Sequence, residues 1–106
     1  MEKDIALYRE KLQRYYTTGG KLAQYPQKRP MRILALSRIA QRFEPARQYA
    51  EKEVNEIIQG AIAFPDVELV RRELYEYRFL DRRRDGSAYW PEDNWQEAYG
   101  SYLETA

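Results

Sequence analysis

The sequence predicts a mainly helical domain that carries one small β-hairpin. Three observations support this fold class. Consecutive segments repeat apolar residues at helical spacing, Phe64-Pro65-Asp66 reads as a turn between two of them, and Asp85-Gly86 lies between two short runs that favour strands. The length of 106 residues is that of one domain. We therefore expect one globular domain with a helical core.

The composition excludes several classes of function. The chain contains no cysteine and no histidine, which rules out disulfides, the usual structural zinc sites and histidine-based acid–base catalysis. The net charge is only +1, so a site for a polyanion must come from a local cluster of arginines. No apolar run could span a membrane, and the N-terminus does not resemble a signal peptide. We expect a cytoplasmic protein that is not an enzyme and has no cofactor, metal site or membrane contact.

The N-terminal segment predicts a helix over residues 1–17 and a connector over residues 18–30. One apolar stripe runs along the helix at positions Ile5, Tyr8, Leu12 and Tyr15. The connector contains pairs of glycine and proline residues, which interrupt helices. The chain is therefore expected to divide into three parts: an N-terminal helix and connector (1–29), a core (30–90) and a helical tail (91–106).

Three helices are predicted in the core. The first begins near Pro30, which suits a first helical turn, and stops before Glu44-Pro45. The second covers about residues 51–60. The third runs from about Val67 to Tyr77, with Asp66 as its N-cap. The residues expected to face inward are Ile33, Leu36, Ile39, Ala40, Phe43, Val54, Ile57, Ile58, Ala61, Val67, Val70, Leu74 and Tyr77. We expect Leu74 to be fully buried.

A hairpin is predicted over residues 79–90, because Asp-Gly is a strong signal for a two-residue turn. The register that follows from this turn is Arg84 opposite Ser87, Arg82 opposite Tyr89 and Asp81 opposite Trp90.

Three helices followed by a hairpin is the order of elements in a winged helix-turn-helix. In that fold the third helix enters the major groove of DNA, and the hairpin, or wing, lies against the backbone. The predicted fold is thus a winged helix-turn-helix core with extra N- and C-terminal helices. The residues that would contact double-stranded DNA are Arg71, Arg72, Arg82, Arg83 and Arg84.

A second interpretation of these arginines is surface ion pairing. Acidic residues balance the arginines over residues 65–90. At helical spacing Arg72 could pair with Glu68 or Glu76, and Arg71 with Glu68. The sequence leaves both interpretations open.

The terminal segments predict a second kind of surface. Residues 92–104 read as a helix, and apolar residues line one face of each terminal helix. In a homodimer these faces would meet across a two-fold axis, and removing residues 92–106 would leave a folded monomer. The alternative is that they pack within one chain. The candidate self-association residues are Ile5, Leu12, Tyr15, Trp95, Tyr99 and Leu103. They favour a second hypothesis for the function, a protein-interaction module that does not bind DNA.

Two signatures resemble a bacterial domain family of unknown function. They are RFEPARQYAEKEVNEII at residues 42–58, and RRELYEYRFLDR at residues 71–82 closing with DGSAYW at residues 85–90. That family occurs alone and fused behind ArsR-type and MerR-type regulators. The resemblance covers roughly residues 30–90. It implies a winged-helix-like fold and an association with transcription, without enzyme activity.

This sequence departs from the family pattern at three places. Ala50 stands where the family has Thr or Ser, which removes the side-chain oxygen of a capping box with Glu53. Arg78 stands where the family has Gly, so a left-handed backbone there would cost about 1–2 kcal/mol. The turn from Gly60 to Pro65 is about two residues longer than in the family. These departures lead us to expect an altered docking geometry on DNA.

Overall fold

The structure is a computed structural model that describes the backbone of residues 2–103 and the side chains of residues 5–103. Residues 1 and 104, the outer ends of the two predicted terminal helices, lie outside this range. The described chain is mainly helical and has one two-stranded antiparallel hairpin. The elements are α1 (Glu2–Leu12), η1 (Gln13–Tyr15), α2 (Arg29–Ala40), α3 (Glu51–Ala61), α4 (Val67–Glu76), β1 (Leu80–Arg82), β2 (Tyr89–Pro91), α5 (Trp95–Ala98) and α6 (Gly100–Leu103).

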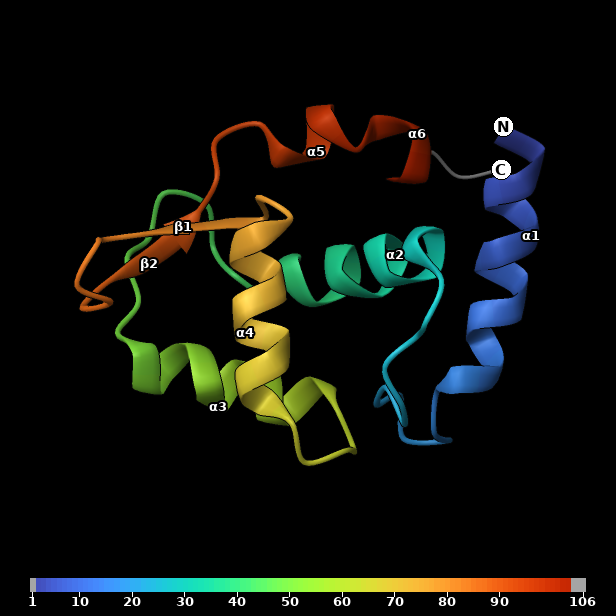
Figure 1. Cartoon of the computed structure of the whole chain (residues 1–106), viewed down its shortest axis with the longest axis horizontal. Coiled ribbons are helices and arrows are strands. Elements are labelled where there is room, and N and C mark those ends of the chain that lie inside the picture. Colours follow the sequence, from blue (N-terminus) through green and yellow to red (C-terminus); the bar gives the residue numbers. More distant parts are fainter. Residues whose placement is uncertain (1, 104–106) are drawn as a thin grey trace.

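Helix α2 is the central element of the fold. It lies between α1 at one end of the molecule and the hairpin at the other, with α5 and α6 along one edge (Figure 1). Its buried residues lie on nearly every side of the helix, as expected for a helix that is packed all round. The buried set is Met31, Ile33, Leu34, Ala35, Leu36, Ser37, Ile39 and Ala40. The Ser37 hydroxyl donates to the Leu34 carbonyl, which satisfies its polar group inside the core.

The three predicted core helices are confirmed, with small shifts at their ends. Helix α2 stops at Ala40, before the predicted end near Glu44, but Phe43 is still buried. Asp66 caps α4, because its Oδ1 accepts from the Leu69 N–H at 3.2 Å. Leu74 is fully buried, as predicted. Val67, Ile57 and Tyr77 face the core but are only partly buried.

Helix α3 starts with half of a capping box. The Glu53 carboxylate accepts from the Ala50 N–H at 2.8 Å. Ala50 has no side-chain oxygen, so no reciprocal bond forms to the first amides of the helix. Replacing such a cap by alanine typically costs about 0.5–2 kcal/mol.

The predicted connector is built into the core. Leu22 is buried, its N–H donates to the Ala61 carbonyl at 2.9 Å, and its carbonyl accepts from the Ala63 N–H at 2.7 Å. The Tyr25 hydroxyl donates to a Glu73 carboxylate oxygen at 2.5 Å. The connector therefore joins the turn after α3 to the middle of α4, so the expected boundary near residue 29 does not separate an appendage from the packed core.

Helix α4 ends in a Schellman motif. The Phe79 N–H donates to the Leu74 carbonyl at 2.9 Å, and the Arg78 N–H donates to the Tyr75 carbonyl at 3.1 Å. Arg78 has φ of 68°, which is the left-handed conformation expected for this position. The motif turns Phe79 back over Leu74, and both side chains are fully buried. An arginine occupies the position that this motif usually gives to glycine.

The hairpin register is confirmed, but its loop is longer than predicted. Arg82 lies opposite Tyr89 and Asp81 opposite Trp90. Beyond them the Arg83 N–H donates to Ala88, and the Gly86 N–H donates back to the Arg83 carbonyl. The turn is therefore centred on Arg84 and Asp85, with Gly86 left-handed at φ 78°, and the predicted Arg84–Ser87 pair does not form a strand pair.

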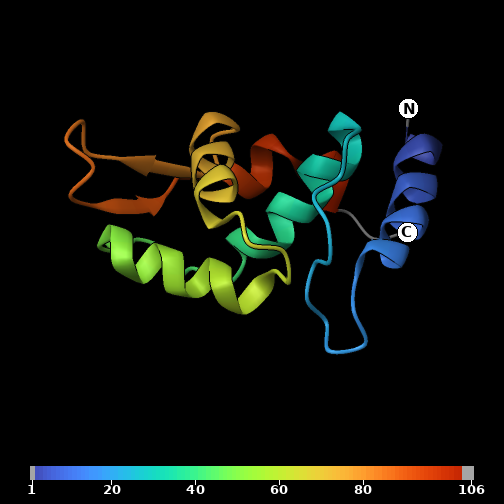
Figure 2. The same ribbon diagram turned by 60° about the horizontal axis from the view of Figure 1, so that its bottom comes forward.

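The other edge of β2 pairs with a single residue. Tyr49 and Tyr89 exchange two backbone hydrogen bonds of 2.7 and 2.8 Å. The segment between α2 and α3 thus holds β2 in place. In a second view the hairpin extends beside α3 (Figure 2).

The predicted C-terminal helix is two short helices. The chain leaves helical geometry at Tyr99, and α6 resumes at Gly100. The break directs the Tyr99 ring onto Phe79, with which it stacks at a centroid distance of 4.6 Å. Trp95 meets the same Phe79 edge-on at 5.2 Å.

The six candidate self-association residues contact the core of their own chain. Leu12 and Trp95 are buried, and Ile5, Tyr15, Tyr99 and Leu103 are partly buried against the core. This is the intramolecular packing that the sequence left open as an alternative. Because Trp95 and Tyr99 cover Phe79, we now expect removal of residues 92–106 to expose the core rather than to leave it intact.

Candidate nucleic-acid interface

The arginines predicted to contact DNA lie on α4 and the hairpin, and the structure brings three of them together. A pocket of about 270 Å³ separates α4 from the hairpin. It is lined by Glu68, Arg71, Arg72, Tyr75, Arg82 and Tyr89. Arg83 and Arg84 follow Arg82 and are exposed in the hairpin loop. Three of the five predicted arginines thus line one pocket, and the other two lie in the adjoining hairpin loop.

Arg71 is held by neighbouring side chains. Its guanidinium donates to the Asn55 Oδ1 at 2.6 Å and lies 3.9 Å from Glu51 and 3.8 Å from Glu68. Only 15% of its side chain is exposed. Of the two interpretations of Arg71, the structure supports ion pairing, and the partners include α3 residues as well as Glu68. Arg71 therefore joins α3 to α4 rather than extending towards a ligand.

Arg72 has a different environment one residue further along α4. It is exposed, and it forms no ion pair with Glu68, Glu76 or any other residue in the described part of the chain. Its guanidinium is free to contact a ligand. The outward row of α4 around it also carries Glu68, Tyr75 and Glu76, so its surroundings are mixed in charge.

Tyr75 links α4 to the hairpin. The Arg82 guanidinium lies 4.7 Å from the centre of the Tyr75 ring, a cation–π distance. Tyr75 is 38% exposed, which is high for a large aromatic side chain. Tyr75 was not among the predicted site residues. Its position one turn after Arg71 and Arg72 was the available signal, but the contact with Arg82 depends on how the hairpin folds back.

The hairpin loop carries both signs of charge. Asp85 accepts hydrogen bonds from Ser87, chiefly from its backbone N–H, and these bonds lower the pKa of the Asp85 carboxyl. Asp85 is therefore anionic near neutral pH, between Arg84 and Gly86. No ion pair holds Arg83 or Arg84 within the described residues. The loop presents two unpaired guanidinium groups beside one carboxylate.

The comparison with known families identifies the core. A family described as an uncharacterized protein conserved in bacteria (DUF2087) matches residues 21–91. The chain belongs to this family. The match begins within the predicted connector, in agreement with the packing of Leu22 and Tyr25 into the core. No curated protein and no solved structure gives a match.

Within the described residues no group of acidic side chains is arranged to hold a metal ion. None of the described helices combines the length and apolar character needed to cross a membrane.

Proposed function

We propose that this chain is a bacterial DNA-binding domain that acts in transcriptional regulation through a winged helix-turn-helix core. In this proposal α2, α3 and α4 form the helical part and the hairpin is the wing. The observation that supports it is that Arg72 and Arg82 line one pocket, Arg83 and Arg84 follow in the hairpin loop, and none of these guanidinium groups forms an ion pair within the described part of the chain. Free arginines beside an exposed helix are what phosphate and guanine recognition requires.

Each of these arginines has a proposed role. Arg72, on the outward face of α4, would lie nearest the base edges. Arg83 and Arg84 would contact phosphates from the wing. Arg82 would hold the wing against Tyr75, at the 4.7 Å distance from its ring. Arg71 supports α4 through Asn55 and Glu51 and contributes little direct contact.

The resemblance to domains fused behind ArsR-type and MerR-type regulators supports the link with transcription. It also supports an accessory role, in which the domain works together with a regulator. Either role would place the protein in the cytoplasm.

The acidic residues on the same face limit the strength of binding. Three acidic residues of α4 and the hairpin loop are exposed, as the free arginines are: Glu68, Glu76 and Asp85. We therefore expect weak binding that depends on salt with a shallow slope, rather than the tight binding of a strongly basic domain.

Fluorescence anisotropy with a labelled random duplex at low salt tests the proposal. Wild-type protein should raise the anisotropy, and Arg72→Ala should weaken binding. On a selected sequence, Arg72→Ala should also relax the preference at one base pair by about 1–3 kcal/mol. Arg14→Ala is the matched control, because Arg14 is an exposed arginine of η1 at the other end of the molecule. Absence of binding to any duplex at low salt would refute the proposal.

A protein-interaction module is the second candidate function. The observation that favours it is the exposed Tyr75 on an outward row of α4 that also carries Glu68 and Glu76. An exposed aromatic ring among charges of both signs suits a protein partner. Self-association through the terminal helices stays a prediction. If the protein binds no duplex, whether it is a monomer or a dimer, the result would support the protein-interaction function.

A further inference from the structure

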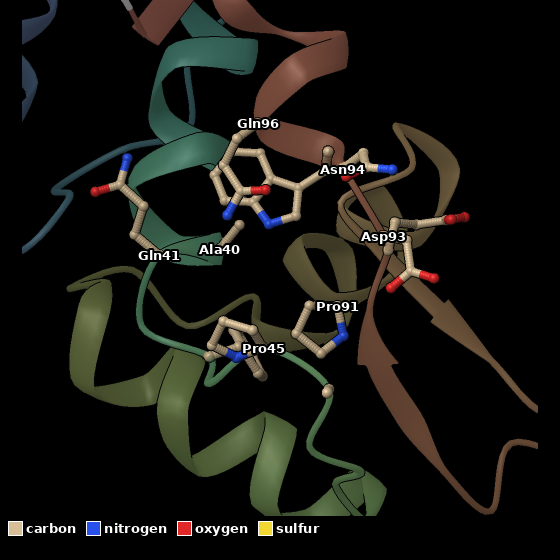
Figure 3. Close-up of a pocket in the computed structure, with 11 residues that line it drawn as sticks. Ala40, Gln41, Pro45, Pro91, Asp93, Asn94 and Gln96 are labelled. Carbon is tan, nitrogen blue, oxygen red and sulfur yellow. The ribbon is translucent and has the colours of Figure 1, made fainter.

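A second pocket, of about 560 Å³, lies at the end of β2 that is remote from the hairpin loop. It is formed by the end of α2, the loop between α2 and α3, and the segment that leads from β2 into α5. Pro45 and Pro91 lie together on one side, and Ala40 and Gln96 lie on the other (Figure 3). No ligand site was predicted in this region.

Trp95 contributes an unused hydrogen-bond donor to this pocket. Trp95 is only 4% exposed, and its indole N–H forms no hydrogen bond with any of the described residues. Within the described residues no fully buried side-chain nitrogen or oxygen lacks a partner, so the indole nitrogen must reach open space. Trp95 lines this pocket, and the N–H therefore opens into it. The indole N–H can only donate, so it is available to an acceptor from outside the described residues, whether solvent or a ligand.

The charged side chains that line the pocket are of one sign. None of its 11 lining residues is a lysine or an arginine, whereas Glu92 and Asp93 are both acidic. The Glu92 carboxylate lies 3.7 Å from Arg78, which partly neutralises it. Asp93 is exposed and forms no ion pair within the described part of the chain. An anionic ligand would meet unbalanced repulsion here, and a cation would meet attraction.

We propose that this pocket binds a small organic cation that also carries a carbonyl or hydroxyl oxygen. The ammonium or guanidinium group of the ligand pairs with Asp93, and its oxygen accepts from the Trp95 indole. Phe43, Pro45 and Pro91 contact the apolar part of the ligand, and the amides of Gln41 and Gln96 add polar contacts at the rim. This site is separate from the α4–hairpin surface, so the proposal stands independently of DNA binding.

Titration with L-argininamide, observed by NMR, tests the proposal. This probe carries a guanidinium group, an amine and a carboxamide oxygen. In a Trp90→Phe background the protein has one indole N–H signal, that of Trp95, because the chain contains two tryptophans. We expect a saturable shift of this signal at millimolar probe concentration. N-acetylglycinamide, a neutral acceptor, and succinate, an anion, should bind much more weakly.

A pair of charge variants separates specific binding from a general effect of charge. Asp93→Asn should weaken argininamide binding about tenfold, because a charge-assisted contact is lost. Glu97→Gln is the matched control, since Glu97 is an exposed acid of α5 that does not line the pocket, and it should leave the affinity unchanged.

Three results would overturn the proposal. The first is an indole signal that does not move with argininamide. The second is equal affinity for the neutral amide or for succinate. The third is a folded Asp93→Asn protein that binds as tightly as the wild type. Asp93 is on the surface, so its variant is expected to fold, which can be checked from the rest of the NMR spectrum.

Discussion

The two ends of the molecule carry different kinds of side chain and use them differently. In the terminal helices the aromatic and aliphatic residues are packed against the core, as Leu12 of α1 and Trp95 of α5 show. At the hairpin end Arg83 and Arg84 extend into solvent without an ion pair among the described residues. The sequence predicted an interaction surface in both regions. An apolar stripe can therefore be satisfied within a small fold, whereas the exposed arginines of the hairpin stay accessible to a partner.

Replacing Trp95 tests the packed end with the largest expected effect. Trp95→Ala should lower the free energy of unfolding by about 3–5 kcal/mol, because it leaves a cavity beside Phe79. Chemical denaturation measures this change. Leu7→Ala on α1 is the control, since Leu7 is 48% exposed, and it should change stability by less than about 0.5 kcal/mol. A Trp95→Ala protein as stable as the wild type would show that the tail does not cover the core.

Leu74 tests the inner face of the helix whose outer face carries Arg72. Leu74→Ala should destabilise the protein by about 2–5 kcal/mol, since Leu74 is fully buried on the inner face of α4. A shift below about 0.5 kcal/mol in denaturation would mean that α4 faces solvent there. The assignment of its outer face would then be wrong as well.

The contact between Tyr25 and Glu73 gives a smaller effect with a pH dependence. Tyr25→Phe should cost about 1.5–3 kcal/mol at neutral pH, because it removes a hydrogen bond to a charged acceptor. Burial, followed by the hydrogen bond to Glu73, raises the pKa of the Tyr25 hydroxyl above its ordinary value. The folded state then keeps a proton that the unfolded state releases above about pH 10, so this stabilisation is complete below that pH and declines as pH rises.

Denaturation of both proteins at several pH values measures this difference. The stability gap between the wild type and Tyr25→Phe should be constant near neutral pH and should narrow above about pH 10. A gap that stays constant throughout the alkaline range would contradict the assigned role of the hydroxyl.

Arg78 should give the smallest effect, and it is a gain. Arg78→Gly should stabilise the protein by about 1 kcal/mol, because glycine adopts the left-handed backbone without steric cost. Arg78→Ala keeps the Cβ atom and removes the exposed guanidinium, so it should stay near the wild type. Equal stability of the glycine and alanine variants would show that the backbone at Arg78 is not strained.

The elements that the sequence predicted well depend on local signals. Asp66 caps α4 through contacts within one turn, and the turn at Arg84 and Asp85, with Gly86 left-handed after it, holds the hairpin in its register. The helical spacing of Val70 and Leu74 predicted that both lie on the inner face of α4, and both are buried there. Each of these features is determined by residues that are near neighbours in the chain.

The features that were missed depend on contacts between distant segments. The break at Tyr99 lets its ring stack on Phe79, and Leu22 is held by the carbonyl of Ala61 and the N–H of Ala63. For the candidate site, the arginines were identifiable from their clustering. The restraint of Arg71 by Asn55 and the contact of Arg82 with Tyr75 require the packed arrangement of α3, α4 and the hairpin.

The salt dependence of DNA binding tests the central claim most directly. The comparison uses two double variants that lose the same charge at opposite ends of the molecule, Arg83→Ala/Arg84→Ala on the hairpin and Lys11→Ala/Arg14→Ala beside α1 (Figure 1). The plot of log K against log salt has a negative slope. If both hairpin arginines contact phosphates, the magnitude of this slope should be smaller by about 1.8 in the hairpin variant, at about 0.9 per contact. The slope of the α1 variant should stay at the wild-type value. Equal slopes for all three proteins, or no binding by the wild type, would contradict the account.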